Sequence, residues 1–157
     1  MRAVFYTHTA YFESAMSIVR ALSARLELHV LMEVSPRAWQ LAGFDVQRTH
    51  YSSSIVAADR LLKPRMPDEV RTFWREAASF NIVLHDARRF YAPGSLRVSL
   101  SVLRMIRDLA PDVVHFDSTP LRLGLLSVIW PQTRYVLSEH DPRPHAGRPI
   151  GESTWPG

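Results

Sequence analysis

The stretch that decides the fold is RAVFYT at residues 2–7, followed by FESAMSIVRALSAR at 12–25 and LELHVLMEV at 26–34. The first segment is a short run of β-branched and aromatic residues, which is typical of a strand. In the second segment apolar residues recur at helical spacing. The third is nearly continuous in apolar residues, as expected for a strand buried on both faces of a parallel sheet. The chain therefore opens with a predicted strand–helix–strand unit.

The same alternation returns in the second half of the chain. Ser95 is a candidate N-cap for a helix with an apolar stripe, and the segment PDVVHFDS follows it as a strand. The segment PLRLGLLSVIW then predicts a helix that Pro131 ends. The expected strands are 2–7, 26–34, 80–85, 112–117 and 133–138. This pattern predicts an α/β fold, a Rossmann-like three-layer domain with a parallel sheet of about five strands in the order 3-2-1-4-5.

An aromatic-rich insert at residues 36–79 separates the second and third expected strands, and it carries two helix candidates at about 54–63 and 67–79. Its pattern assigns it no role. We divide the chain into a Rossmann-like domain at 1–139, which contains this helical insert, and a Pro- and Gly-rich active-site loop at 140–157. Nothing periodic resumes after Gly147, so we expect a domain that is incomplete at the C-terminus.

The composition places the chain among globular proteins. A length of 157 residues fits one domain, and 46% hydrophobic with 22% charged residues excludes a disordered or fibrous class. The absence of cysteine excludes disulfides and thiol catalysis. No apolar run has membrane-spanning length and no signal peptide is recognisable, so we expect a cytoplasmic protein, with the inner membrane surface as a second location.

The charge balance favours anionic partners. Lys and Arg number 19 against 15 acidic residues, which gives a formal charge of +4. Nucleic acid is not expected, because the arginines are scattered along the chain and do not cluster on one element. The segment RLLKPR at 60–65 would suit a lipid-linked or anionic acceptor at a membrane, although a solvated helix end explains it more simply.

Polar and titratable residues gather where the expected strands end. In parallel α/β sheets ligands bind at the carboxyl ends of the strands, so these residues define a predicted cleft. Its candidate members are His8, Thr9, Tyr11, Asp117, Ser118, Glu139 and Asp141. For Asp117 and Ser118 the alternative is a capping role before the Pro-led helix.

His140 is the strongest single candidate. Its imidazole could hydrogen-bond a sugar hydroxyl or accept a proton, with Glu139 or Asp141 fixing the tautomer. The alternative is a histidine that bonds a backbone carbonyl at a strand end. His115 alternates with apolar neighbours, so we interpret it as a satisfied core histidine.

Two kinds of site are not expected. The histidine and aspartate spacings match no compact ligand motif, so we expect no metal. The first strand–helix turn, HTAYFES, contains no glycine, which argues against a dinucleotide-binding or P-loop phosphate site and so against a dehydrogenase or ATPase.

Two segments carry a family resemblance. IRDLAPDVVHFDSTP at 106–120 and YVLSEHDPRPHAG at 135–147 resemble the N-terminal half of retaining GT-B glycosyltransferases of the family 4 type. The resemblance implies two Rossmann-like domains facing a cleft, with the N-terminal domain binding the acceptor and the C-terminal domain binding a nucleotide sugar. It places His140 near the donor sugar and the reacting centre, as the catalytic residue.

The resemblance also sets the functional expectation. It implies an acceptor-binding domain of a hexosyltransferase type of enzyme, with a nucleotide-sugar co-substrate, no cofactor, and an unknown acceptor that is carbohydrate or lipid-linked. The family's first strand–helix loop is usually rich in glycine, whereas this chain has TAYF at 9–12. We expect the fragment to be inactive without the donor domain. The alternative is a free-standing flavodoxin-like binding or regulatory module, so whether the chain is an enzyme stays open.

Overall fold

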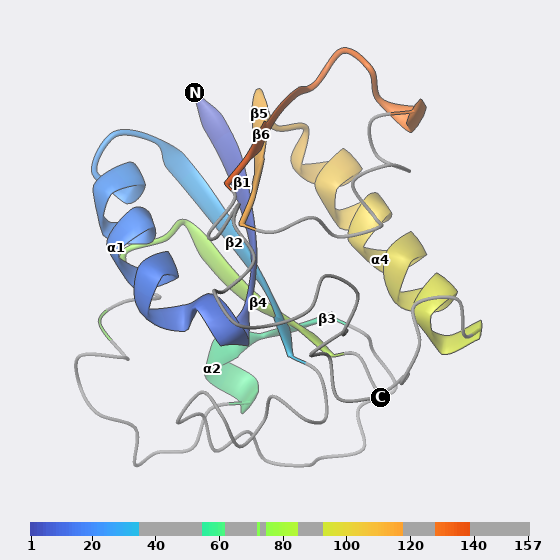
Figure 1. Ribbon diagram of the computed structural model, residues 1–157, viewed down its shortest axis with the longest axis horizontal. Helices are drawn as coiled ribbons and strands as arrows, with labels where there is room; N and C mark the ends of the chain where they lie inside the picture. Colours follow the sequence, from blue (N-terminus) through green and yellow to red (C-terminus); the bar gives the residue numbers. More distant parts are fainter. Residues whose placement is uncertain (35–54, 62–71, 73–74, 85–92, 118–127, 139–157) are drawn as a thin grey trace, which may run out of the picture.

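The computed structural model describes residues 1–34, 55–61, 72, 75–84, 93–117 and 128–138. These residues form an α/β domain, broadly Rossmann-like, in which helices lie on both sides of a mostly parallel sheet (Figure 1). The strands are β1 (Arg2–His8), β2 (Glu27–Val34), β3 (Ile55–Ala57), β4 (Ser79–Leu84), β5 (Val113–Phe116) and β6 (Arg134–Leu137). The helices are η1 (Thr9–Tyr11), α1 (Phe12–Ser23), α2 (Ala58–Leu61) and α4 (Pro93–Leu109).

The sheet differs from the predicted one in strand count, and the additional strand changes the order at one edge. It has six strands in the order β3-β4-β2-β1-β5-β6, where about five in the order 3-2-1-4-5 were predicted. The added strand is β3, which pairs antiparallel with β4 at the edge, so the sheet is mixed and not purely parallel. The other neighbours, from β4 through β2, β1 and β5 to β6, all pair parallel.

Strand β3 also corrects the helix predicted at 54–63. Residues 55–57 are extended and Ala58–Leu61 are helical, whereas 54, 62 and 63 lie outside the described residues. Val56 and Ala58 both enter the core beside β4, so the tertiary contact of this short apolar run outweighs its helical periodicity. The second predicted helix, at 67–79, lies mostly outside the described residues, and its last residue, Ser79, begins β4.

Two hydrophobic cores lie on the two faces of the sheet. Residues alternate along β1, so that Ala3 and Phe5 join the core under α1, whereas Val4 and Tyr6 join the core under α4. Helices α1 and α4 lie on opposite sides of the sheet (Figure 1). This makes the three layers that the sequence predicted.

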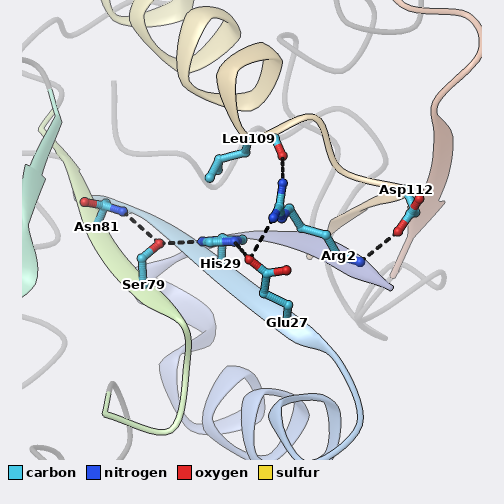
Figure 2. A network of polar contacts seen from close by, with 7 residues as sticks. All are labelled: Arg2, Glu27, His29, Ser79, Asn81, Leu109 and Asp112. Carbon is cyan, nitrogen blue, oxygen red and sulfur yellow. Dashed lines mark hydrogen bonds and ion pairs between the residues drawn. The ribbon is translucent and has the colours of Figure 1, made fainter.

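A polar network ties the amino ends of the strands together (Figure 2). The Arg2 guanidinium donates to the Leu109 carbonyl at the end of α4, at 2.9 Å, and lies 3.0 Å from the Glu27 carboxylate. A cation at this position also interacts favourably with the negative end of the helix dipole. The Arg2 backbone N–H donates to the Asp112 carboxylate at 2.8 Å, just before β5.

The network continues through His29 into β4. Its Nδ1 lies 2.8 Å from the Ser79 hydroxyl, and its Nε2 lies 3.4 Å from the Glu27 carboxylate, an ion-pair distance and not a well-formed hydrogen bond. The hydrogen bond from Arg2 is the largest influence on Glu27 and lowers the pKa of its carboxyl. The contribution of Glu27 to stability is therefore present above its ordinary pKa of 4.5 and is lost as the pH falls below it.

Helix α4 ends in a left-handed residue. Ala110 has φ of 45°, and its N–H bonds the Ile106 and Arg107 carbonyls at 3.1 Å each. A Cβ in this region is crowded against the following carbonyl, and glycine removes that crowding. Pro111 then prevents the helix from continuing.

The substitution Ala110→Gly should stabilise the protein by about 1 kcal/mol and raise Tm by ~3 °C, because it relieves the left-handed strain. Thermal unfolding followed by circular dichroism measures the shift. The matched control is Ala24→Gly at the end of α1, where φ of −67° is right-handed, and this change should lower Tm. Equal shifts in both variants would contradict the assignment of strain to Ala110.

Candidate functional site

The candidate site lies at the carboxyl ends of β1 and β5. The Asp117 N–H donates to the Tyr6 carbonyl at 2.9 Å, which extends the parallel ladder one step beyond β5 and sets Asp117 beside Thr7. The Thr7 hydroxyl then donates to the Asp117 carboxyl at 2.8 Å. Asp117 is 0% exposed and Thr7 is 1% exposed, so this polar pair is built into the interior.

These side chains share the face of the sheet that α1 covers. Thr7 follows Phe5 by two residues and Asp117 follows His115 by two, and alternate residues of a strand point to the same face. The rings of Phe5 and His115 confirm the shared face, since their centroids are 5.0 Å apart. Phe5 belongs to the core under α1.

His115 links this pair to β6. Its Nε2 lies 2.7 Å from the Ser138 hydroxyl, and the Ser138 N–H donates to the Phe116 carbonyl at 2.8 Å. Burial lowers the pKa of His115 below its ordinary value of 6.5, and the negative charge of Asp117 offsets part of that effect. The prediction that the His115 ring is hydrogen-bonded is therefore confirmed, but the residue is half-buried and belongs to neither hydrophobic core.

Thr9 completes the arrangement at the start of η1. Its side chain is only 3% exposed, yet its Oγ1 has no hydrogen-bond partner among the described residues. Buried hydroxyls are nearly always hydrogen-bonded, so an unpaired one is a candidate position for a bond to a ligand or to water. We call Thr7, Thr9, His115, Asp117 and Ser138 the carboxyl-edge cluster.

The first turn of α1 adds partial positive charge to this edge. Tyr11 occupies the N-cap position with φ of −108° and makes no side-chain cap hydrogen bond. The Ser14 hydroxyl bonds the Tyr11 carbonyl at 2.9 Å and therefore does not cap the backbone N–H groups. The helix dipole leaves the first turn favourable to a hydrogen-bond acceptor.

The predicted site residues divide into those that the structure describes and those that it does not. His8 ends β1 and is half-buried, as is Tyr11, while Thr9 and Asp117 are buried. His8 and Thr9 thus lie at the carboxyl end of β1, and Asp117 lies at the carboxyl end of the neighbouring β5. Ser118, Glu139, His140 and Asp141 lie outside the described residues.

Three members of the carboxyl-edge cluster, Thr7, His115 and Ser138, are not among the predicted cleft residues. The sequence predicts Ser138 only as the last residue of a strand and His115 only as a core residue. The signal for His115 was the two-residue alternation, which sets it on the same face as Asp117. Ser138 has no comparable signal in the sequence, because its place depends on the pairing of β6 with β5.

Within the described ranges there is no group of three or more His, Asp or Glu residues that could hold a metal ion. None of the helices in the same ranges is both long enough and apolar enough to cross a membrane.

Comparisons with protein-family models, with curated proteins and with solved structures gave no match to this chain.

The substitution Thr7→Val should destabilise the protein by about 1–3 kcal/mol, because it leaves the buried Asp117 carboxyl without one of its donors. Urea denaturation measures the free energy of unfolding. The matched control is Thr9→Val, the same change at another buried threonine two residues away. Because the Thr9 hydroxyl has no partner to lose, this variant should stay within ~0.5 kcal/mol of the wild type or gain stability. A larger loss in Thr9→Val than in Thr7→Val would contradict this assignment.

The lowered pKa of His115 predicts a pH dependence of stability. The unfolded chain binds a proton on this residue more readily than the folded one, so stability is full above pH 6.5 and falls as the pH drops below it. In His115→Gln this decline between pH 7.5 and pH 5 should be smaller, by the part that His115 contributes. Urea midpoints across this pH range test the difference, since the remaining histidines are common to both proteins. Parallel pH profiles would show that His115 does not carry the effect.

Proposed function

We propose that this chain is the acceptor-side domain of a glycosyltransferase that uses a nucleotide-sugar donor, and that the carboxyl-edge cluster binds a sugar hydroxyl of the acceptor. The observation that carries the proposal is the buried hydroxyl of Thr9, which has no partner among the described residues and follows the Thr7 of the Thr7–Asp117 pair by two residues. The two sequence segments that resemble family 4 GT-B enzymes supply the reaction class.

A hydroxyl-bearing ligand fits this edge better than a phosphate does. Once the groups that cover it move aside, the Thr9 hydroxyl can donate to one sugar oxygen or accept from another, and a sugar would satisfy it without introducing charge. The negative charge of Asp117 opposes a diphosphate, because like charges in a poorly solvated site repel strongly. This favours the acceptor over the donor as the molecule bound here.

Asp117 acts in this proposal by positioning. It is fully buried and accepts from Thr7, which fixes the end of β1 and hence the start of η1 that carries Thr9. The half-buried His8 and Tyr11 flank Thr9 in sequence and complete the binding edge.

The donor and the reacting centre are assigned by the resemblance. His140 acts there on the reacting sugar, flanked by Glu139 and Asp141, and Ser118 belongs to the cleft beside Asp117. A second domain binds the nucleotide sugar, whose departing diphosphate needs electrostatic stabilisation. No metal or cofactor is required for this chemistry.

Nuclear magnetic resonance titration of the ¹⁵N-labelled chain tests the proposal. Methyl glucoside and methyl mannoside should shift the amide resonances of residues 7–11, and Thr9→Val should weaken that binding about tenfold through loss of one buried hydrogen bond. UDP and GDP alone should leave these resonances unchanged, since the donor belongs to the other domain.

The control variant is Ser14→Ala, which removes an exposed hydroxyl of the same region that bonds only the local backbone. It should bind the glycosides as the wild type does. If no glycoside shifts residues 7–11, or if Thr9→Val binds as tightly as the wild type, the proposed site is wrong. Binding of flavin mononucleotide at this edge would support the flavodoxin-like alternative.

A further inference from the structure

Helix α4 exposes apolar side chains on its outward face, where they do not pack against the sheet. Its inward residues Val98, Val102 and Ile106 are buried in the core against the sheet. On the other side of the helix Leu96 is 57% exposed and Leu100, one turn further on, is 47% exposed. An amphipathic helix normally directs its leucines toward the core, so these two form a second, solvent-exposed apolar patch on α4.

Arginines surround the two leucines. Two exposed leucines and three exposed arginines fall within an arc of about 100° around the helix axis, at 3.6 residues per turn. They are Leu96, Leu100, Arg97, Arg104 and Arg107. We call these five residues the α4 ridge.

The ridge carries a net positive charge. Arg107 lies 3.0 Å from the Asp108 carboxylate, which neutralises it in part. Arg97 and Arg104 have no acidic side chain within ion-pair distance in the part of the chain that the structure describes. Their guanidinium groups are therefore available to an anionic partner.

We propose that the α4 ridge docks on an anionic membrane surface, with Leu96 and Leu100 entering the boundary between headgroups and acyl chains and the arginines contacting lipid phosphates. Interfacial helices bind in this way, through a modest apolar area combined with attraction to anionic lipid. Guanidinium groups suit the task because they pair with phosphate in a bidentate geometry.

The chemistry of the ridge favours a lipid surface over other anionic partners. A nucleic acid would use the arginines but would leave two exposed leucines without a role. The hollow along α4, lined by Ser101, Arg104, Met105, Asp108 and Leu109, is open to solvent and offers no enclosed pocket for a side chain of a partner protein. A straight, convex row of leucines and arginines matches a flat charged interface.

This inference does not depend on the proposed function. The carboxyl-edge cluster lies on the face of the sheet that α1 covers, whereas α4 packs on the opposite face (Figure 1). A failure of sugar binding would leave membrane docking untouched, and the reverse also holds.

Co-sedimentation with vesicles tests the proposal. The chain should bind phosphatidylcholine vesicles that contain phosphatidylglycerol and should not bind phosphatidylcholine alone. Each arginine near such a surface contributes about fivefold, so the double variant Arg97→Gln, Arg104→Gln should weaken binding by about 25-fold. The double variant Leu96→Ser, Leu100→Ser should weaken it by about tenfold. All four positions are exposed, so circular dichroism should show an unchanged fold.

The matched control removes the same charge elsewhere. Arg25 at the end of α1 and Arg134 on β6 are exposed, and the double variant Arg25→Gln, Arg134→Gln should weaken binding no more than about twofold. An equal loss in this variant and in the ridge variant would overturn the proposal, because diffuse charge would then explain the binding. Absence of binding to the anionic vesicles would overturn it as well.

Insertion can be followed directly because the chain contains no cysteine. A polarity-sensitive fluorophore attached to Leu100→Cys should shift to shorter wavelength on the anionic vesicles. The same label on Ser17→Cys, an exposed position of α1, should not shift. An unshifted label at position 100, or a ridge variant that loses binding to a DNA oligonucleotide and not to vesicles, would overturn the membrane assignment.

Discussion

The pairing of β1 between β2 and β5 is the interaction on which the rest of the structure depends. The strand is buried on both faces and pairs in register with β2 over its whole length. Because side chains alternate, one face of β1 contributes to each core, and α1 and α4 are held to opposite sides by the same seven residues. A shift of one residue in this register would exchange the two faces and set Thr7 against the α4 core. The position of the candidate site is therefore fixed by the burial of β1.

Both ends of the sheet hold buried polar atoms that have no hydrogen-bond partner among the described residues. At the amino end these atoms are Arg2 Nε and His29 Nε2, and both side chains use their other atoms to bond Leu109 and Ser79. At the carboxyl end, the Thr7–Asp117 pair is satisfied, but the Thr9 hydroxyl is buried with no partner among the described residues. An unsatisfied buried hydroxyl lowers stability, and a sequence can retain it without a structural gain when a ligand supplies the missing bond. Arg2 and His29 stabilise the sheet through their other atoms, whereas the side chain of Thr9 has a single polar atom and that atom is unpaired among the described residues, which is the reason for placing the ligand at the carboxyl end.

The sequence predicted the strands that depend on long apolar runs and failed where a strand depends on its neighbour. The segments at 26–34 and 112–117 contain enough apolar residues to be recognised as strands from the sequence, and both contain strands of the sheet. Strand β3 has only three residues and continues directly into α2, so its local pattern cannot be told from a helix start. Its extended form comes from hydrogen bonds to β4, which periodicity does not record.

The sequence predicts site residues where it also predicts the end of a strand. Asp117 and Thr9 were chosen because they follow apolar runs, and the structure places both at the carboxyl edge. The hydroxyl that pairs with Asp117 and the one that faces His115 were not identified, since these contacts join residues 110 and 23 positions apart. Which strand lies beside which decides such contacts, and a single sequence holds that information only indirectly.

The arrangement of the two faces gives the proposals a common geometry. Side chains at the carboxyl edge point to the α1 side of the sheet, and the α4 ridge points away from it on the other side. A membrane in contact with α4 would therefore be separated from the Thr7–Asp117 pair by the sheet itself. The ligand would reach the carboxyl edge from the aqueous side, where a hydroxyl-rich group is well solvated before it binds. A lipid-linked acceptor would meet this requirement if its sugar stands clear of the bilayer, because the sheet lies between the α4 face and the Thr7–Asp117 pair. The two proposals together thus favour acceptors whose reactive hydroxyl extends beyond the headgroup layer.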